Sequence, residues 1–164
     1  MTVLSYKLRD ASGALVAVHE RGERENGAKT FTWRQPDGSL GLAGTPVAAL
    51  PLYGIERLSG SATVLVVEGE KATDALLGIG VQAVGTVTGA SATPSAIPLA
   101  ELGGRRVVLW PDNDEVGRAH RQRIGAASLE LLPTFVGSTG PTPRRTATRQ
   151  TSSRPVRPGR PWRH

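Results

Sequence analysis

The sequence predicts an α/β protein with a central parallel sheet and flanking helices, preceded by a small β-rich segment and followed by a disordered tail. Two observations support this fold class. Residues 61–131 alternate short apolar runs with helical patterns, as strands buried on both faces and their crossover helices do. Acidic residues follow the first and third of these runs, at the points where the strands are expected to end.

The β-rich segment covers residues 1–58. Residues 3–8, 15–19 and 30–34 alternate apolar and polar side chains, which predicts three short strands. Asp10-Ala11-Ser12-Gly13 and Pro36-Asp37-Gly38 are turn sequences, because proline presets φ and glycine tolerates positive φ. Residues 51–55 are expected to connect this segment to the next.

Residues 61–131 form the predicted α/β domain. Its expected strands are residues 64–67, 83–87 and 106–110. Its expected helices are residues 70–79, 99–102 and 115–131. The first helix is expected to carry four apolar residues on one side, namely Ala72, Ala75, Leu76 and Ile79.

The net charge of +6 comes entirely from the C-terminal tail. Residues 1–132 contain 13 Lys and Arg against 14 Asp and Glu, a sum of −1, whereas residues 133–164 contain seven Arg and no acid, a sum of +7. Basicity therefore does not indicate whether the folded part binds nucleic acid. The absence of cysteine excludes disulfides and Cys-ligated zinc within this chain. Without a long apolar run or a signal-peptide pattern, we expect a cytoplasmic protein with no membrane partner.

Residues 133–164 are rich in Arg, Pro, Ser and Thr and are expected to be disordered. Two origins remain open for this tail. It is a natural basic tail, or the product of a frameshift near residues 131–134, because reading the codons one base earlier permits a strand followed by an acidic segment. The nucleotide sequence decides between them.

Two acidic clusters carry the chemistry. Val67-Glu68-Gly69-Glu70-Lys71 follows the first buried strand, and Trp110-Pro111-Asp112-Asn113-Asp114-Glu115-Val116-Gly117 follows the third. Ligands of open α/β sheets bind at the carboxyl ends of the strands. Glu68, Asp112 and Asp114 are therefore expected to converge, and three neighbouring carboxylates repel one another unless a cation lies between them. Oxygen ligands suit Mg²⁺ or Mn²⁺.

Each cluster alone also has a structural explanation. Pro-Asp-Asn-Asp is a common turn and helix start, and Asp114 or Asn113 is expected to cap the helix that begins near Glu115. Four basic residues near the clusters are candidates to bind phosphate, with solvated surface charge as the alternative: Lys71, Arg105, Arg106 and Arg118. We expect Arg121 and Arg123 to lie on the exposed helix face and His120 to have no evident partner.

The two clusters together resemble the signature motifs of the Toprim domain. Their exact residues are most similar to those in primases of phages and mobile elements. The resemblance covers about residues 61–131. It implies a DnaG-like DNA primase fragment that makes RNA primers on single-stranded DNA by metal-dependent nucleotidyl transfer, with Glu68, Asp112 and Asp114 as catalytic and metal-binding residues. It also implies nucleoside triphosphates as substrates and a replicative helicase as a partner.

The sequence departs from the family pattern in two respects. The aspartate that many primases carry four residues after the motif glutamate is Ala72 here, and Asp74 is expected to be a solvated helix residue. No zinc module or G-x-x-x-x-G-K-[ST] helicase motif occurs in the chain. The alternatives are a Toprim nuclease or topoisomerase-like phosphodiester enzyme, for which Tyr6 and Tyr53 lack an activating context, and an inactive, truncated nucleic-acid-binding relic.

We predict that the tail is dispensable for folding. Removal of residues 133–164 should leave the melting temperature unchanged within about 2 °C, because a segment without apolar periodicity contributes little to a core. Differential scanning calorimetry of the full and truncated chains tests this, and a loss of many degrees would contradict it.

Overall fold

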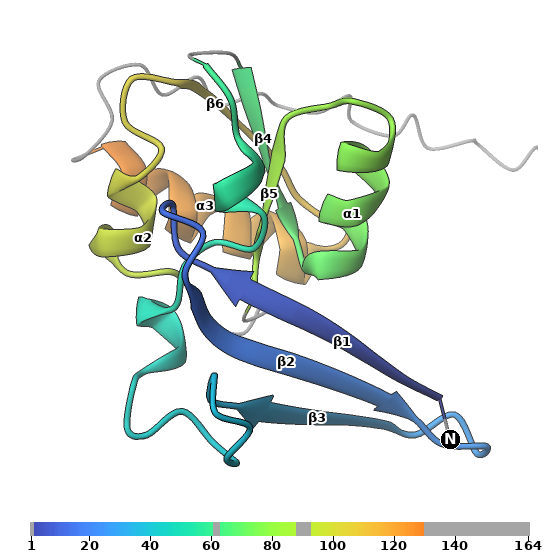
Figure 1. Ribbon diagram of the computed structural model, residues 1–164. Coiled ribbons are helices and arrows are strands. Elements are labelled where there is room, and N and C mark those ends of the chain that lie inside the picture. The colour runs from blue at the N-terminus through green and yellow to red at the C-terminus, as the bar shows by residue number, and fades with distance from the viewer. Residues whose placement is uncertain (1, 61–62, 88–92, 130–164) are drawn as a thin grey trace, which may run out of the picture.

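The computed structural model describes residues 2–60, 63–87 and 93–129, so the predicted tail lies outside the described residues. Its first sheet is antiparallel, in the order β1-β2-β3 (Figure 1), and comprises β1 (Thr2–Arg9), β2 (Leu15–Glu23) and β3 (Lys29–Arg34). The three predicted strands are confirmed, and β2 runs further than expected. The Asp10 carboxylate accepts hydrogen bonds from backbone N–H groups in the first turn.

The second sheet is parallel and has β4 at its centre. It contains β4 (Thr63–Glu68), β5 (Ala83–Thr86) and β6 (Arg106–Trp110) in the order β5-β4-β6. The register pairs Glu68 with Thr86 and Val67 with Trp110. All three strands therefore end at one edge of the sheet, as the sequence predicts.

Three helices flank the parallel sheet, α1 (Glu70–Gly78), α2 (Ala96–Ala100) and α3 (Glu115–Leu129). Helix α1 covers one face, and α2 and α3 cover the other (Figure 1). The main core lies on the α2 and α3 face and includes Val64 and Val66 of β4, Leu99 of α2 and Ile124 of α3. The fold class is thus an α/β parallel sheet with flanking helices and an N-terminal β segment. Helix α2 begins three residues before its predicted start.

The predicted apolar side of α1 is wrong. Ile79 is 75 % exposed, whereas Thr73 is completely buried. The reason is Gly85 on β5, which has no side chain and so leaves room for Thr73 to pack against the sheet. A Cβ atom at Gly85 would clash with the Thr73 hydroxyl and lie 2.7 Å from the Gly69 carbonyl oxygen. The Thr73 hydroxyl instead donates a hydrogen bond to that carbonyl.

The connector between the two sheets joins the edge of the parallel sheet. Tyr53 and Gly85 exchange two backbone hydrogen bonds of 2.9 Å, just before a 3₁₀ turn at Ile55–Arg57. The Tyr53 hydroxyl contacts both carboxylate oxygens of Asp74 at 3.1 Å, and the Arg57 guanidinium lies 2.8 Å from Asp74. Asp74 was expected to be merely solvated, and this expectation is wrong because it anchors the connector to α1.

A buried histidine–glutamate pair joins the antiparallel sheet to the first acidic cluster. His19 of β2 lies 2.6 Å from Glu70 at the start of α1, and both are more than 90 % buried. The His19 ring stacks on Trp33 with a centroid distance of 4.1 Å. A second core, which includes Leu8, Leu50 and Val87, fills the space between the antiparallel sheet and the end of β5.

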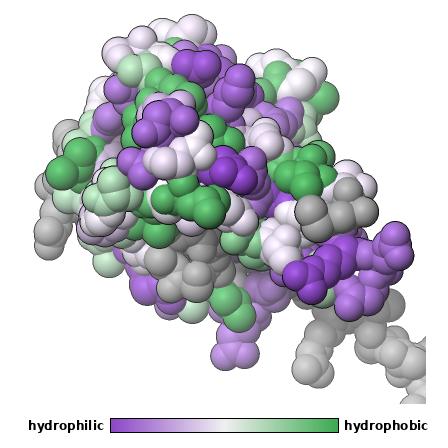
Figure 2. All heavy atoms as spheres, turned by 60° about the horizontal axis from the view of Figure 1, so that its bottom comes forward, coloured by the Kyte–Doolittle hydropathy of each residue, from purple (hydrophilic) through white to green (hydrophobic). Residues whose placement is uncertain are grey.

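Large apolar side chains are exposed at scattered positions. In the view of Figure 2, apolar areas alternate with polar ones instead of forming one continuous patch. The exposed residues come from several elements and include Phe31, Leu40, Ile97 and Trp110. Within the described residues, no helix combines the length and apolar character needed to cross a bilayer.

We predict that His19→Ala destabilises the protein by about 3 kcal/mol, because it removes the stack on Trp33 and leaves the Glu70 carboxylate buried without its partner. The matched control is Glu20→Ala on the same strand, which breaks a more exposed pair with Arg34 and should cost less than about 1 kcal/mol. Urea unfolding measures both free energies. Equal losses would show that the buried pair has no special role.

Candidate functional site

The candidate site lies at the edge of the parallel sheet where the strands end. Glu68 is the last residue of β4, and Asp112 and Asp114 lie in the short segment between β6 and α3. Because β4 and β6 are parallel neighbours, this topology brings the first and second acidic clusters to the same edge. Asp112 and Asp114 are exposed, and Glu68 is half-buried.

The environment of Glu68 favours its protonated form. Burial is the main cause that raises the pKa of Glu68, and the negative charge of Asp112 adds to it, with a smaller contribution from Asp114. A hydrogen bond from the Asp112 backbone N–H and the charge of Arg123 act in the opposite direction. The Oε1 atom of Glu68 is buried and has no hydrogen-bond partner among the described residues.

Asp114 starts helix α3. Its Oδ1 atom accepts a 2.7 Å hydrogen bond from the backbone N–H of Gly117, so the predicted capping role is confirmed for Asp114. This bond holds the carboxylate beside the helix terminus. The segment that carries Asp112 is thereby fixed between a strand end and a capped helix.

Gly117 permits the close approach of α3 to the first acidic cluster. A Cβ atom there would lie 2.5 Å from the carbonyl oxygen of Asp112 and 3.0 Å from Oε1 of Glu68. Any side chain would push both groups away. Glycine at this position therefore allows Glu68, Asp112 and the helix start to share one small space.

The donor chemistry of the site fits a hard divalent cation. Glu68 and Asp112 offer carboxylate oxygens at one edge, and the Oε1 atom of Glu68 has no hydrogen-bond partner among the described residues. Within residues 2–60, 63–87 and 93–129, no three His, Asp or Glu side chains are grouped closely enough to enclose a metal ion. Mg²⁺ needs no such cage, because it usually keeps several waters and binds one or two carboxylates together with substrate phosphates.

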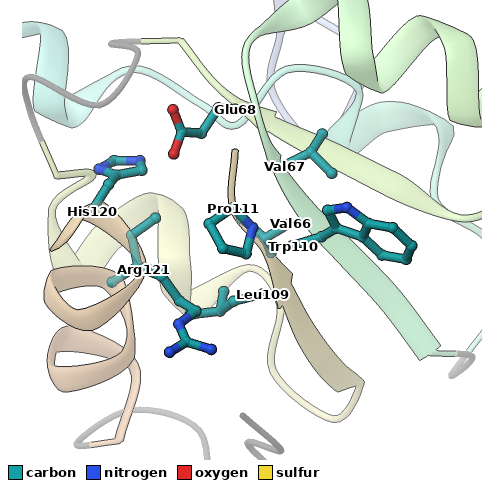
Figure 3. Close-up of a pocket in the computed structure, with 9 residues that line it drawn as sticks. Val66, Val67, Glu68, Leu109, Trp110, Pro111, His120 and Arg121 are labelled. Carbon is teal, nitrogen blue, oxygen red and sulfur yellow. The ribbon is translucent and has the colours of Figure 1, made fainter. Parts of the chain in front are cut away.

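A small pocket adjoins Glu68. Figure 3 shows the Glu68 carboxylate and the His120 ring on the same side of this pocket, with Arg121 from the next position of α3. The expectations that His120 has no partner and that Arg121 only covers the exposed face are wrong. His120 is 1 % exposed, and its Nε2 atom lies 3.2 Å from the Thr86 hydroxyl. The spacing of Gly117, His120 and Ile124 on one helix face was the available signal.

The predicted phosphate-binding residues do not lie together. Lys71 in the first turn of α1 and Arg118 on α3 are exposed near the carboxyl edge. Arg105 and Arg106 lie at the start of β6, about 13 Å away along the five-residue strand. Arg123 is exposed, as expected, and in addition its charge acts on Glu68 and its Nε atom donates a 3.2 Å hydrogen bond to the Thr93 hydroxyl.

Two solved structures from bacteriophage T7 share this architecture. The first contains the T7 lagging-strand DNA polymerase interacting with the primase domains of two gp4 subunits bound to an RNA/DNA hybrid and dTTP; the match has a TM-score of 0.55 and 20 % identity, and covers 85 % of this chain and 66 % of that one. The second is the primase fragment of the T7 primase–helicase protein, with a TM-score of 0.52, 19 % identity and 85 % and 54 % coverage. The fold is primase-like.

The likeness to the T7 structures is one of fold, since identity is low. The chain spans about two thirds and about half of the length of the two matched chains. No family model matches the sequence, and no curated protein does. The primase-like fold includes the parallel sheet whose edge carries Glu68, Asp112 and Asp114.

We predict that Gly117→Ala disrupts the site of this primase-like fold, because the new methyl group would clash with the Asp112 backbone and Glu68 Oε1. The loss of stability should be about 1–3 kcal/mol. The control is Gly78→Ala in α1, where a Cβ atom would meet nothing within 4 Å and should stabilise by up to about 1 kcal/mol. Chemical denaturation compares them. Similar gains at both positions would contradict the close approach at Gly117.

Proposed function

We propose that this chain is the Toprim-type catalytic part of a DNA primase, which synthesises RNA primers on single-stranded DNA by metal-dependent nucleotidyl transfer. The observation that carries the proposal is the convergence of Glu68 and Asp112 at the carboxyl edge of the parallel sheet in a primase-like fold. Because the chain spans only part of the matched structures, the proposal concerns the catalytic contribution of this part.

In this proposal Asp112 and Asp114 are the main ligands of Mg²⁺ or Mn²⁺, and Glu68 binds directly, through water, or acts as general base. A bound divalent cation would lower the pKa of the attacking 3′-hydroxyl and offset negative charge on the triphosphate. The capped start of α3 holds Asp114 in place, and the Asp112 N–H orients the Glu68 carboxylate.

The raised pKa of Glu68 suits proton transfer. A partly buried carboxylate beside another acid accepts a proton more readily than an exposed one, so Glu68 is suited to take the proton of an attacking hydroxyl group. Exposed Lys71 and Arg118 flank the edge and would bind phosphates of the template or the incoming nucleotide. The positive charge of Arg121, which lines the pocket, would also favour binding of a negatively charged phosphate.

The partners in this proposal are single-stranded DNA, nucleoside triphosphates and a replicative helicase, and the setting is replication of a phage or mobile element in the cytoplasm. The T7 structures support this choice, because one contains primase domains with an RNA/DNA hybrid and dTTP and the other belongs to a primase–helicase.

The environment of the tyrosines disfavours a topoisomerase-like reaction. Burial is the main cause that raises the pKa of both Tyr6 and Tyr53. The charge of Glu70 raises the pKa of Tyr6 further, whereas Arg57 partly offsets the rise at Tyr53. A nucleophilic tyrosine needs the opposite shift. The Tyr53 hydroxyl is moreover engaged by Asp74 and Arg57.

We predict that Mn²⁺ raises the melting temperature of the wild type by several degrees at concentrations well above its Kd, and that Asp112→Asn abolishes this rise.

Without metal, Glu68→Gln should be more stable than the wild type at neutral pH. The folded-state pKa of Glu68 is raised, so its ionisation lowers stability as pH rises through that pKa, and glutamine removes this loss.

Calorimetry with and without Mn²⁺ measures these shifts, and Glu25→Gln at an exposed turn serves as the charge-matched control. Equal metal-induced shifts in wild type and Asp112→Asn would remove Asp112 from the site. A labelled-nucleotide assay on single-stranded DNA then tests the reaction. We expect weak ribonucleotide polymerisation that Asp112→Asn eliminates, whereas strand cleavage would indicate a Toprim nuclease, and metal binding without either would indicate a relic.

A further inference from the structure

Two residues that line the pocket beside the acidic edge each have a buried polar atom without a partner. These atoms are Oε1 of Glu68 and Nδ1 of His120, and neither has a hydrogen-bond partner among the described residues. Figure 3 shows the two side chains facing one another. The cavity volume is about 10 Å³, the space that one water molecule needs. Buried polar atoms are normally paired, so two such atoms at one small cavity indicate a shared polar ligand.

The sheet register fixes where the His120 ring lies. Its Nε2 atom contacts the Thr86 hydroxyl, and Thr86 is the direct neighbour of Glu68 across β4 and β5. Paired residues of a parallel sheet point to the same face, so Glu68 and Thr86 both face α3. His120 is therefore held above this pair of strand ends, and its other ring nitrogen, Nδ1, is buried without a partner among the described residues.

We propose that His120 is a positioning residue for Glu68, holding one water molecule or hydroxyl group that donates a hydrogen bond to Oε1 of Glu68. This inference rests on the proposed function, because it assigns Glu68 a role that depends on the orientation of its carboxylate. The Asp112 N–H supports the carboxylate from one side, and the group bound to His120 supports it from the other. His120 does not itself touch the substrate.

The hydrogen-bond directions follow from satisfying every donor. In the proposed arrangement the Thr86 hydroxyl, whose oxygen lies 3.2 Å from Nε2, donates its proton to that nitrogen. The neutral ring then carries its proton on Nδ1, which donates to the water or hydroxyl oxygen. That group donates in turn to Glu68. The chain thus runs from Thr86 through His120 to the carboxylate, and it requires the Nδ1–H tautomer, which a free histidine side chain disfavours.

The tautomer gives a test that needs neither metal nor activity. Long-range ¹H–¹⁵N NMR of the ¹⁵N-labelled chain distinguishes the two neutral forms, and the spectrum of His120→Asn identifies the His120 signals among the three histidines. We expect Nδ1–H in the wild type and in Thr86→Ser, which keeps the hydroxyl. Glu68→Met keeps the volume but removes the acceptor, and should shift the ring toward Nε2–H.

An Nε2–H ring in the wild type would overturn the proposal, and so would an Nδ1–H ring that Glu68→Met leaves unchanged. A merely structural histidine would not respond to the loss of a carboxylate that it does not contact directly. Because this spectrum is recorded without metal or substrate, it remains decisive for His120 even if primer synthesis is not found.

A pair of variants tests the consequence for the reaction. The amide of asparagine can replace the Nδ1 group of histidine, whereas the longer glutamine reaches the position of Nε2. His120→Gln should therefore keep the Thr86 contact but lower kcat by about tenfold with KM for nucleotide unchanged, as losses of supporting residues do. His120→Asn should retain more activity. The reverse order, or a change confined to KM, would contradict the positioning role, and absence of activity in the wild type would instead count against the proposed function.

Discussion

The parallel register of β4 between β5 and β6 is the constraint on which the site depends. It aligns the carboxyl ends of three strands, so that Glu68 and Thr86 are neighbours and the segment after Trp110 begins beside them. Apolar side chains of β4 are buried against α2 and α3, so a slip of one residue would place them on the wrong face. The hydrophobic pattern that stabilises the sheet therefore also sets the position of the acids.

The antiparallel sheet supports this edge. The His19–Glu70 pair and the packing of Val87 against the second core join it to the end of β4 and β5. Glu70 lies two residues after Glu68, with Gly69 between them at a φ of 78°. The backbone thus turns so that one glutamate enters the contact between the sheets and the other faces α3. Two glutamates only two residues apart therefore have different surroundings, and only Glu70 pairs with the antiparallel sheet.

The sequence was most informative for features that depend on the residues of a single strand or helix. Continuous apolar runs predicted all three parallel strands, and carboxylates directly after β4 and β6 predicted that Glu68, Asp112 and Asp114 share an edge. Contacts between distant elements were not accessible in this way. Thr73 is buried because Gly85 leaves room for it, and His120 is paired because β5 ends beneath α3. Such contacts depend on packing rather than on the local periodicity of one segment.

The distribution of charge on the folded part affects which ligands the acidic edge can bind. Residues 1–132 sum to −1, so no general excess of positive charge draws phosphate to this part, and the acidic edge itself would repel a triphosphate. In the proposed function, a divalent cation would reduce both effects, because it would offset the carboxylate charges and attract the triphosphate. Burial and the neighbouring acids Asp112 and Asp114 all raise the pKa of Glu68 at this edge.

The most direct test of this account is a crystal structure of the chain grown with Mn²⁺, with anomalous diffraction used to locate the ion. The account predicts one strong anomalous peak at the carboxyl edge of the parallel sheet, within coordination distance of Asp112 and next to Glu68. A peak elsewhere, or an edge without manganese at concentrations that saturate other Mn²⁺ enzymes, would contradict the central claim that these acids form a cation site.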